Sequence, residues 1–386
     1  SWSGERGCDA GPGGATSGKT LGFRTITRRP ASKILRKDVA AARRCDTVRP
    51  SHCSKGRIDG RGTNTGIDVA DYLAEKPGAR QALAEAVART CDDTGFLVIT
   101  NHGIDQSLID GAFAAASDFF DLDEQRKQAL KVGDLNIGYL PYGAQIVRTS
   151  KVNNNTRPNL SESFYIVTDL AADDPKIVSG DPMYGMNRWP EEMPSFKART
   201  MAYFAAMRPL ADKMVSVVAT SLGLPEDYFA ADFHEPTITL RLIRYPSHDG
   251  ADDNQFGFAP HIDTSFLTLL AQSALPGLEV RTREGNWIRP PAIPGTFVVN
   301  TGEMLSRYSN DRYIPTPHRV INANNALRHA IPFFYGPSLD AVIKPVPTCV
   351  RPDNPAKYEP LLYADHRRKL NLTNFDHRRK QADKAA

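Results

Sequence analysis

The sequence has 386 residues, a net charge of +4, 41% apolar residues and 24% charged residues. This length and composition fit an ordinary globular protein with one large domain or two small ones. No stretch approaches the roughly 20 uninterrupted apolar residues of a membrane-spanning helix, and the N-terminus has no apolar secretory core. We therefore expect neither a membrane span nor a signal peptide.

The positive charge is concentrated at the N-terminal end, where residues 1–61 carry 14 Lys and Arg against 5 Asp and Glu. Residues 1–64 are rich in Gly, Ser, Arg and Thr without a hydrophobic period, which predicts a disordered basic extension. A basic arm can bind nucleic acid or an anionic membrane surface. This one lacks interleaved aromatic residues and any motif for such binding, so we expect neither partner.

Five cysteines are present, of which Cys8, Cys45 and Cys53 fall in the basic extension. Only Cys91 and Cys349 remain in the body of the chain. Their spacing fits neither a zinc site nor a disulfide framework. This pattern indicates a reducing, cytoplasmic location.

Residues 65–235 are predicted to be a helix-rich N-terminal part. Hydrophobic periodicity favours helices over 79–91, 106–120, 123–132 and 194–222, and strands over 96–100 and 163–167. Gly223 follows the longest helix at the position of a C-terminal cap.

From Pro236 the pattern changes to short β-rich segments separated by Pro and Gly. These segments are 237–245, 266–272, 277–281, 296–300, 318–322 and 328–335. Many short strands with regular turns are typical of a sandwich, jelly roll or barrel. We expect residues 236–340 to form this β core. Residues 341–386 then form a C-terminal segment with a short helix over 358–370 and a basic tail.

The segment His261-Ile262-Asp263 contains the first candidate metal ligands. Residues i and i+2 of a strand point to the same face, so an imidazole and a carboxylate meet there. Apolar residues flank the segment, and ionisable groups in such surroundings need partners such as a metal. His318 lies in a later β segment. Two histidines and a carboxylate form the facial triad of non-haem iron(II) oxygenases, which leaves coordination positions open.

Arg328 follows ten residues after His318 and shares a strand face with Ala330. A guanidinium in a β-lined pocket is suited to a bidentate grip on a carboxylate. Three aromatic residues, Tyr139, Phe258 and Phe334, are candidates for a substrate pocket, with packing in the core as the alternative.

Several ordered segments resemble one family. They are Thr94-Gly95-Phe96 with Asn101-His102-Gly103, Gly138-Tyr139-Leu140-Pro141, Leu240-Arg241-Leu242-Ile243-Arg244-Tyr245-Pro246, Pro260-His261-Ile262-Asp263, Gly277-Leu278-Glu279-Val280, Pro294 to Asn300, and Pro317-His318-Arg319-Val320. On these segments the region from about Ile67 to Pro337 resembles the isopenicillin N synthase-like group of iron(II)/2-oxoglutarate-dependent dioxygenases.

The resemblance implies a mainly β fold with flanking helices, a double-stranded β-helix or distorted jelly roll. It implies Fe(II) on His261, Asp263 and His318, with Arg328 and Tyr245 holding 2-oxoglutarate, O2 as oxidant and ascorbate as an accessory reductant. The reaction would hydroxylate, desaturate or cyclise a small organic substrate and release succinate and CO2.

Two departures from the family pattern leave alternatives open. The family often has Ser two residues after the Arg and Asn two residues before the Tyr, where this chain has Ala330 and Ile243. Losing one hydroxyl donor to a carboxylate costs about 1–3 kcal/mol. One alternative is an iron oxidase of the same fold that does not use 2-oxoglutarate, or an ethylene- and succinate-forming enzyme. Another is a metal-binding β-barrel without turnover. The primary substrate and the oligomeric state are not readable from the sequence.

Overall fold

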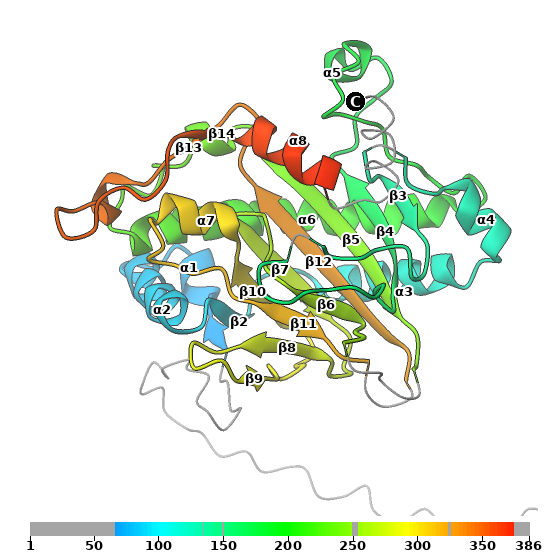
Figure 1. The fold of residues 1–386 in the computed structure, drawn as a ribbon, viewed down its shortest axis with the longest axis horizontal. Coiled ribbons are helices and arrows are strands. Elements are labelled where there is room, and N and C mark those ends of the chain that lie inside the picture. The colour runs from blue at the N-terminus through cyan, green and yellow to red at the C-terminus, as the bar shows by residue number, and fades with distance from the viewer. Residues whose placement is uncertain (1–65, 134, 149, 249–253, 323–325, 374–386) are drawn as a thin grey trace, which may run out of the picture. The chain divides into compact units, whose positions relative to one another are not determined.

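The computed structural model describes residues 66–133, 135–148, 150–248, 254–322 and 326–373. The extension predicted for residues 1–64 lies outside this range. A sheet of eight strands, in the order β1-β2-β10-β7-β12-β5-β4-β3, faces a sheet of four, in the order β6-β11-β8-β9 (Figure 1). The larger sheet contains β1 (Ile67–Asp68), β2 (Phe96–Thr100), β3 (Gly138–Leu140), β4 (Glu162–Val167), β5 (Thr237–Tyr245), β7 (Leu267–Gln272), β10 (Phe297–Thr301) and β12 (Arg328–Gly336). The smaller contains β6 (Phe258–His261), β8 (Leu278–Arg281), β9 (Trp287–Ile288) and β11 (His318–Val320), while β13 (Val342–Ile343) pairs with β14 (Leu361–Leu362).

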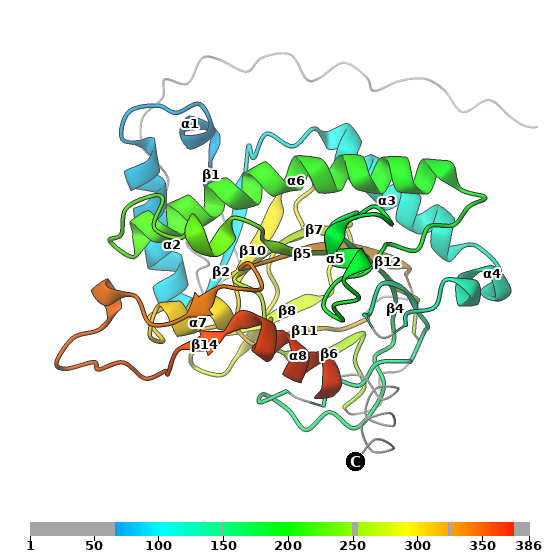
Figure 2. The same cartoon turned by 90° about the horizontal axis from the view of Figure 1, so that it is seen from above.

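Helices flank the larger sheet on both sides (Figure 2). They are α1 (Ala70–Leu73), α2 (Ala79–Asp93), α3 (Gln106–Phe120), α4 (Glu124–Ala129), α5 (Pro175–Val178), α6 (Pro194–Ser221), α7 (Glu303–Tyr308) and α8 (Tyr363–Thr373). The long helix α6 packs against α2 and α3, and α3 also contacts β5 and β12. Figure 2 shows the resulting layers, with α6 on one side of the larger sheet and β8 and β11 on the other. No helix in the described ranges is long and apolar enough to cross a membrane.

Both faces of the larger sheet are buried, which explains why its strands are continuous apolar runs. In β2, Leu97 and Ile99 belong to the core beneath the helices. The alternate residues Phe96 and Val98 pack instead with Val298, Leu278 and Val280 between the two sheets. Because side chains alternate along a strand, a strand covered on both sides needs apolar residues at nearly every position.

The predicted elements differ from the observed ones where neighbouring segments compete for the backbone. The helix expected over 123–132 ends at Ala129, because Val132 donates to the Tyr139 carbonyl as the chain enters β3. The helix expected over 358–370 begins at Tyr363, because the preceding residues form β14. Strands β1 to β4, from the predicted helix-rich part, share one sheet with β5, β7, β10 and β12.

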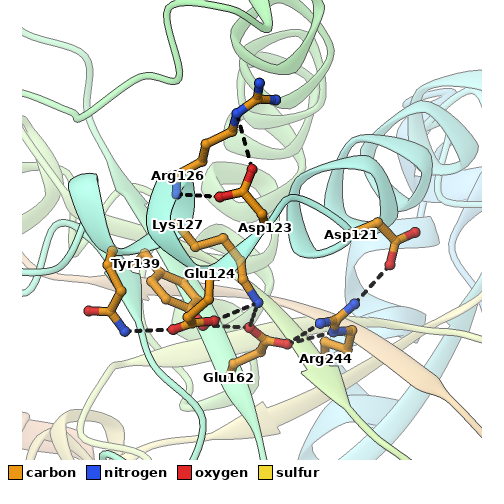
Figure 3. A network of polar contacts seen from close by, with 9 residues as sticks. Asp121, Asp123, Glu124, Arg126, Lys127, Tyr139, Glu162 and Arg244 are labelled. Carbon is orange, nitrogen blue, oxygen red and sulfur yellow. Dashed lines mark hydrogen bonds and ion pairs between the residues drawn. The ribbon is translucent and has the colours of Figure 1, made fainter. Parts of the chain in front are cut away.

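A buried carboxylate joins α4 to the edge of the larger sheet (Figure 3). Glu162 of β4 is 2% exposed. It accepts hydrogen bonds from Lys127 Nζ at 2.9 Å, Tyr139 Oη at 2.7 Å and Arg244 Nε at 2.6 Å. Tyr139, a candidate for the substrate pocket, is therefore a fully buried member of this network, and burial together with the neighbouring Glu162 raises the pKa of its hydroxyl.

Replacing Glu162 should destabilise the fold strongly. In Glu162→Gln, the nearly buried cations Lys127 and Arg244 lose their shared carboxylate, and breaking a buried ion pair costs about 3–5 kcal/mol. Glu124→Gln is the matched control, since Glu124 contacts the same Lys127 at 3.2 Å but has a side chain that is 60% exposed. There the loss should not exceed about 1 kcal/mol. Urea denaturation of both variants measures the difference, and equal losses would contradict this account of the network.

Candidate active site

Two neighbouring strands of the smaller sheet bring the predicted metal ligands together. β6 and β11 run antiparallel with His261 directly opposite His318, and Asp263 follows two residues after the end of β6. Nε2 of each histidine lies 3.6 Å from Asp263 Oδ1. One donor atom from each of the three residues lies within 4.8 Å of the other two. A single cation can therefore contact all three.

Hydrogen bonds orient the two imidazoles toward this point. His261 Nδ1 lies 2.9 Å from the carbonyl of Ala259, and His318 Nδ1 lies 3.1 Å from that of Thr316. Each Nδ1–H donates to a carbonyl, so the lone pair of Nε2 faces the centre. Such hydrogen bonds fix the tautomer and ring orientation of metal-binding histidines.

The carboxylate of Asp263 is oriented by two polar side chains from the larger sheet. Its Oδ2 accepts from Thr268 Oγ1 at 2.6 Å and from Asn300 Nδ2 at 2.7 Å. Oδ1 is thus the oxygen that faces the histidines. Both partners are polar residues within mainly apolar strands. Their polarity is visible in the sequence, but neither residue was predicted to contact Asp263.

The protonation states suit a divalent metal. Burial alone would raise the pKa of Asp263, but its contacts with His318, His261 and the Asn300 amide hold that pKa well below its usual range. Burial, together with the nearby His261, lowers the pKa of His318 to about 4. Near neutral pH the site therefore presents an ionised carboxylate and a neutral His318 imidazole. Two imidazoles and one carboxylate on one side of an ion are the donor set that suits Fe(II).

Arg328 lies across from the triad on β12, opposite Tyr245 of β5 in the sheet register. It is 4% exposed, with Nε donating to the Leu275 carbonyl at 3.2 Å and Nη2 to Gln272 Oε1 at 3.1 Å. Its Nη1 is buried and finds no acceptor among the described residues. Burial lowers the pKa of Arg328 and raises that of Tyr245, whose ring lies 5.0 Å from the guanidinium. A buried cation with an unused donor favours an incoming carboxylate.

The two departures from the family pattern form a single apolar contact. Ile243 and Ala330 are direct partners across β5 and β12, two residues along each strand from Tyr245 and Arg328. They pack in one cluster with Tyr245 and Phe258. The polar contacts that Asn and Ser would add are therefore absent from this pair of positions, while Arg328 itself is retained.

Two cavities adjoin the triad. A narrow one of about 50 Å³ is lined by Arg328, Tyr245 and all three triad residues. A larger one of about 510 Å³ is lined by His261 and Asp263 together with residues of β4, β5 and α8. Two of the candidate aromatic residues, Phe258 and Phe334, line both cavities, whereas Tyr139 lines neither.

Other histidines lie outside the triad. His102 Nε2 contacts the Gly295 carbonyl at 3.1 Å, and its ring packs on Phe297. His329 stacks on Phe120 on the helix-covered side of β12. Both have the packing roles that their positions suggest.

Comparison with known proteins matches both parts of the chain. The family model described as non-haem dioxygenase in morphine synthesis, N-terminal, matches residues 66–192. The model of the 2OG-Fe(II) oxygenase superfamily matches residues 236–337. A 2-oxoglutarate-Fe(II) type oxidoreductase of Emericella nidulans is 32% identical over 305 residues, which cover 78% of this chain and 86% of that protein.

The chain belongs to the 2OG-Fe(II) oxygenase superfamily. A homoarginine-6-hydroxylase of Oryza sativa subsp. japonica is 34% identical over 294 residues, covering 74% of this chain and 87% of that protein. The crystal structure of a putative 2OG-Fe(II) oxygenase family protein from Caulobacter crescentus superimposes with a TM-score of 0.68 at 29% identity, covering 80% of this chain and 99% of that one.

These matches confirm the predicted distorted jelly roll and the predicted family. This 2OG-Fe(II) oxygenase is an oxidoreductase that uses Fe(II), 2-oxoglutarate and O2.

One close backbone contact fixes the turn that holds Asp263. Gly302 donates to the Phe266 carbonyl at 3.0 Å, and Glu303 N donates to the Asp263 carbonyl at 2.8 Å. A Cβ on Gly302 would overlap the backbone of Ser265. We expect Gly302→Ala to lower stability by about 1–3 kcal/mol, the usual cost of overpacking.

The control for this substitution is Gly111→Ala in the middle of α3, where a Cβ meets its nearest neighbour at 4.0 Å. That variant should be stabilised by about 0.5–1 kcal/mol, because alanine favours the helix. Thermal denaturation of both variants gives the sign of each effect. A stabilised Gly302→Ala would show that the backbones of Gly302 and Ser265 are not closely packed.

Proposed function

We propose that this oxygenase oxidises a small organic substrate at an iron held by His261, Asp263 and His318. The observation that carries the proposal is the convergence of these three donors beside a buried, incompletely bonded Arg328. When bound, the iron supplies the activation of O2 that couples oxidative decarboxylation of 2-oxoglutarate, to succinate and CO2, with substrate oxidation. Hydroxylation, desaturation and cyclisation are all compatible with this triad.

Within this proposal the chain's own residues position the reactants. Arg328 binds the distal carboxylate of 2-oxoglutarate through Nη1, while Leu275 and Gln272 hold the rest of the guanidinium in place. Tyr245 packs against the same guanidinium and closes one side of the narrow cavity. The unsatisfied Nη1 favours this reading over an iron oxidase without 2-oxoglutarate, because such an enzyme would leave a buried charge without a partner.

The primary substrate occupies the larger cavity in this proposal, with Phe258 and Phe334 as apolar walls beside the metal. The relative named as a homoarginine hydroxylase supports a small-molecule substrate, without specifying which one this chain takes. The described cysteines Cys91 and Cys349 are buried free thiols, which supports a reducing, cytoplasmic setting.

Removing a metal ligand should abolish both metal binding and turnover. In His261→Ala or Asp263→Ala we expect Fe(II)-dependent succinate release to fall to background and binding of Mn(II), used as an oxygen-stable substitute, to be lost. His234→Ala is the control, since that side chain is 54% exposed and lies outside the triad. Isothermal titration and succinate assays measure the two effects. Full turnover in both ligand variants would reject the metal assignment.

Removing the guanidinium of Arg328 should selectively weaken the binding of 2-oxoglutarate. A charge-assisted hydrogen bond is worth about 1.5–3 kcal/mol, so Arg328→Gln should raise the KM for 2-oxoglutarate by roughly 10- to 150-fold. Arg289→Gln removes a guanidinium that is 51% exposed and pairs with Glu279, and should leave this KM unchanged. Steady-state kinetics with varied 2-oxoglutarate tests both. An unchanged KM in Arg328→Gln would show that Arg328 does not bind 2-oxoglutarate.

A further inference from the structure

A second buried arginine without an acidic partner lies beside the triad. Arg241, in the middle of β5, is 5% exposed and lines the larger cavity together with His261 and Asp263. Its Nε and Nη2 donate to Ser163 Oγ at 3.0 and 2.7 Å, and Nη2 also donates to Gln145 Oε1 at 2.9 Å. Both partners are neutral. Among the described residues Nη1 has no acceptor, and no carboxylate forms an ion pair with this side chain.

Two aromatic rings hold the guanidinium in place. Tyr165 is the direct partner of Arg241 across β4 and β5, and its ring centroid lies 4.7 Å from Arg241 Cζ. Phe258 of β6 lies 4.8 Å away. Since the rings and the Ser163 and Gln145 contacts fix the group from several sides, Nη1 is presented in a defined direction with little rotamer freedom left to lose on binding.

Arg241 differs from Arg244, a neighbouring arginine of the same strand that does have acidic partners. Arg244 lies three residues further along β5 and therefore points to the opposite face. There it pairs with Glu162 and with Asp121, as Figure 3 shows. Burying a charge with neutral hydrogen-bond partners only is costly, and that cost falls when a ligand brings the opposite charge.

The rest of the larger cavity is also positively charged. Its lining contains Lys151, Arg307, Arg367 and Lys369 besides Arg241. The lining carboxylates are Glu303 and the proposed metal ligand Asp263. Arg307 Nε forms an ion pair with Glu303 at 3.6 Å, whereas Arg367 Nε is buried without a hydrogen-bond acceptor among the described residues. Arg367 and Lys369 come from α8.

We propose that the primary substrate is a small organic carboxylate whose anionic group binds to Arg241, with its apolar body against Phe258 and Phe334. The cationic lining draws such a substrate into the cavity, and Arg241 fixes which end lies near the metal. Arg241 is thus a specificity-determining residue for this oxygenase. The inference rests on the proposed function, because it takes the larger cavity to be the substrate site.

The test compares carboxylates with their uncharged amides. The probes are acetate, hexanoate, decanoate, phenylacetate and indole-3-acetate, each with its primary amide. Binding to the full chain is measured by titration calorimetry with Mn(II) and saturating 2-oxoglutarate present. We expect at least one acid to bind tenfold or more tightly than its amide. In Arg241→Gln the preference should fall to twofold or less, while Arg241→Lys keeps part of it.

Arg199→Met serves as the matched control, because it removes a guanidinium of α6 that pairs with Asp118 away from the cavity. It should keep the full preference for the acid, and the melting temperature of every variant checks its folding. The proposal is overturned if no acid is preferred over its amide in the unmodified chain, or if the preference survives in Arg241→Gln. A rise in the KM for 2-oxoglutarate in Arg241→Gln, with acid binding unchanged, would also overturn it. A separate titration of the Mn(II)-loaded chain with 2-oxoglutarate comes first, and failure of 2-oxoglutarate to bind there would instead reject the proposed function.

Discussion

The antiparallel pairing of β6 with β11 is the constraint on which the site depends. It places His261 opposite His318, although 57 positions separate them in the sequence, and leaves Asp263 at the turn that follows β6. Backbone hydrogen bonds to the start of α7 fix this turn, and Thr268 and Asn300 of the larger sheet orient the Asp263 carboxylate. Without that pairing the three donors would be distant polar residues in apolar strands, each with a desolvation cost and no common partner.

Alternation along the strands of the larger sheet separates structural from functional charges. On β5, Arg241 and Tyr245 face the smaller sheet and the cavities, whereas Arg244 faces outward to Glu162. On β12, Arg328 faces the triad and His329 stacks on the helix α3 side. The outward charges are paired with acids and stabilise the fold. The inward arginines are held by neutral groups, which leaves them able to bind anionic ligands.

Much of this architecture could be predicted because it rests on local patterns. The apolar runs of β5 and β12 and the periodicity of α3 specify those elements over their observed lengths, apart from one residue at the end of β12. The His-x-Asp spacing and the later His318 predicted three groups that the structure places together. By contrast, the strand assumed for His261 and Asp263 is wrong in its extent, because β6 ends at His261 and Asp263 lies in the turn that follows.

Residues whose role depends on long-range pairing could not be assigned from the sequence. Tyr139 is an aromatic residue of the type that lines substrate pockets, but its hydroxyl donates a hydrogen bond to Glu162, 23 positions away. Arg241 belongs to the segment Leu240–Pro246, but nothing in that segment predicts its role. Its lack of an acidic partner becomes apparent only when β4, β5 and β6 are assembled.

The central claim is that a single iron binds to two imidazoles and one carboxylate of this chain. X-ray absorption spectroscopy of the anaerobic Fe(II)-loaded protein tests it most directly, together with the iron content of the same sample. The account predicts one iron per chain, two imidazole ligands and otherwise only oxygen donors. Sulfur ligation, or fewer than two imidazoles at the iron, would contradict it.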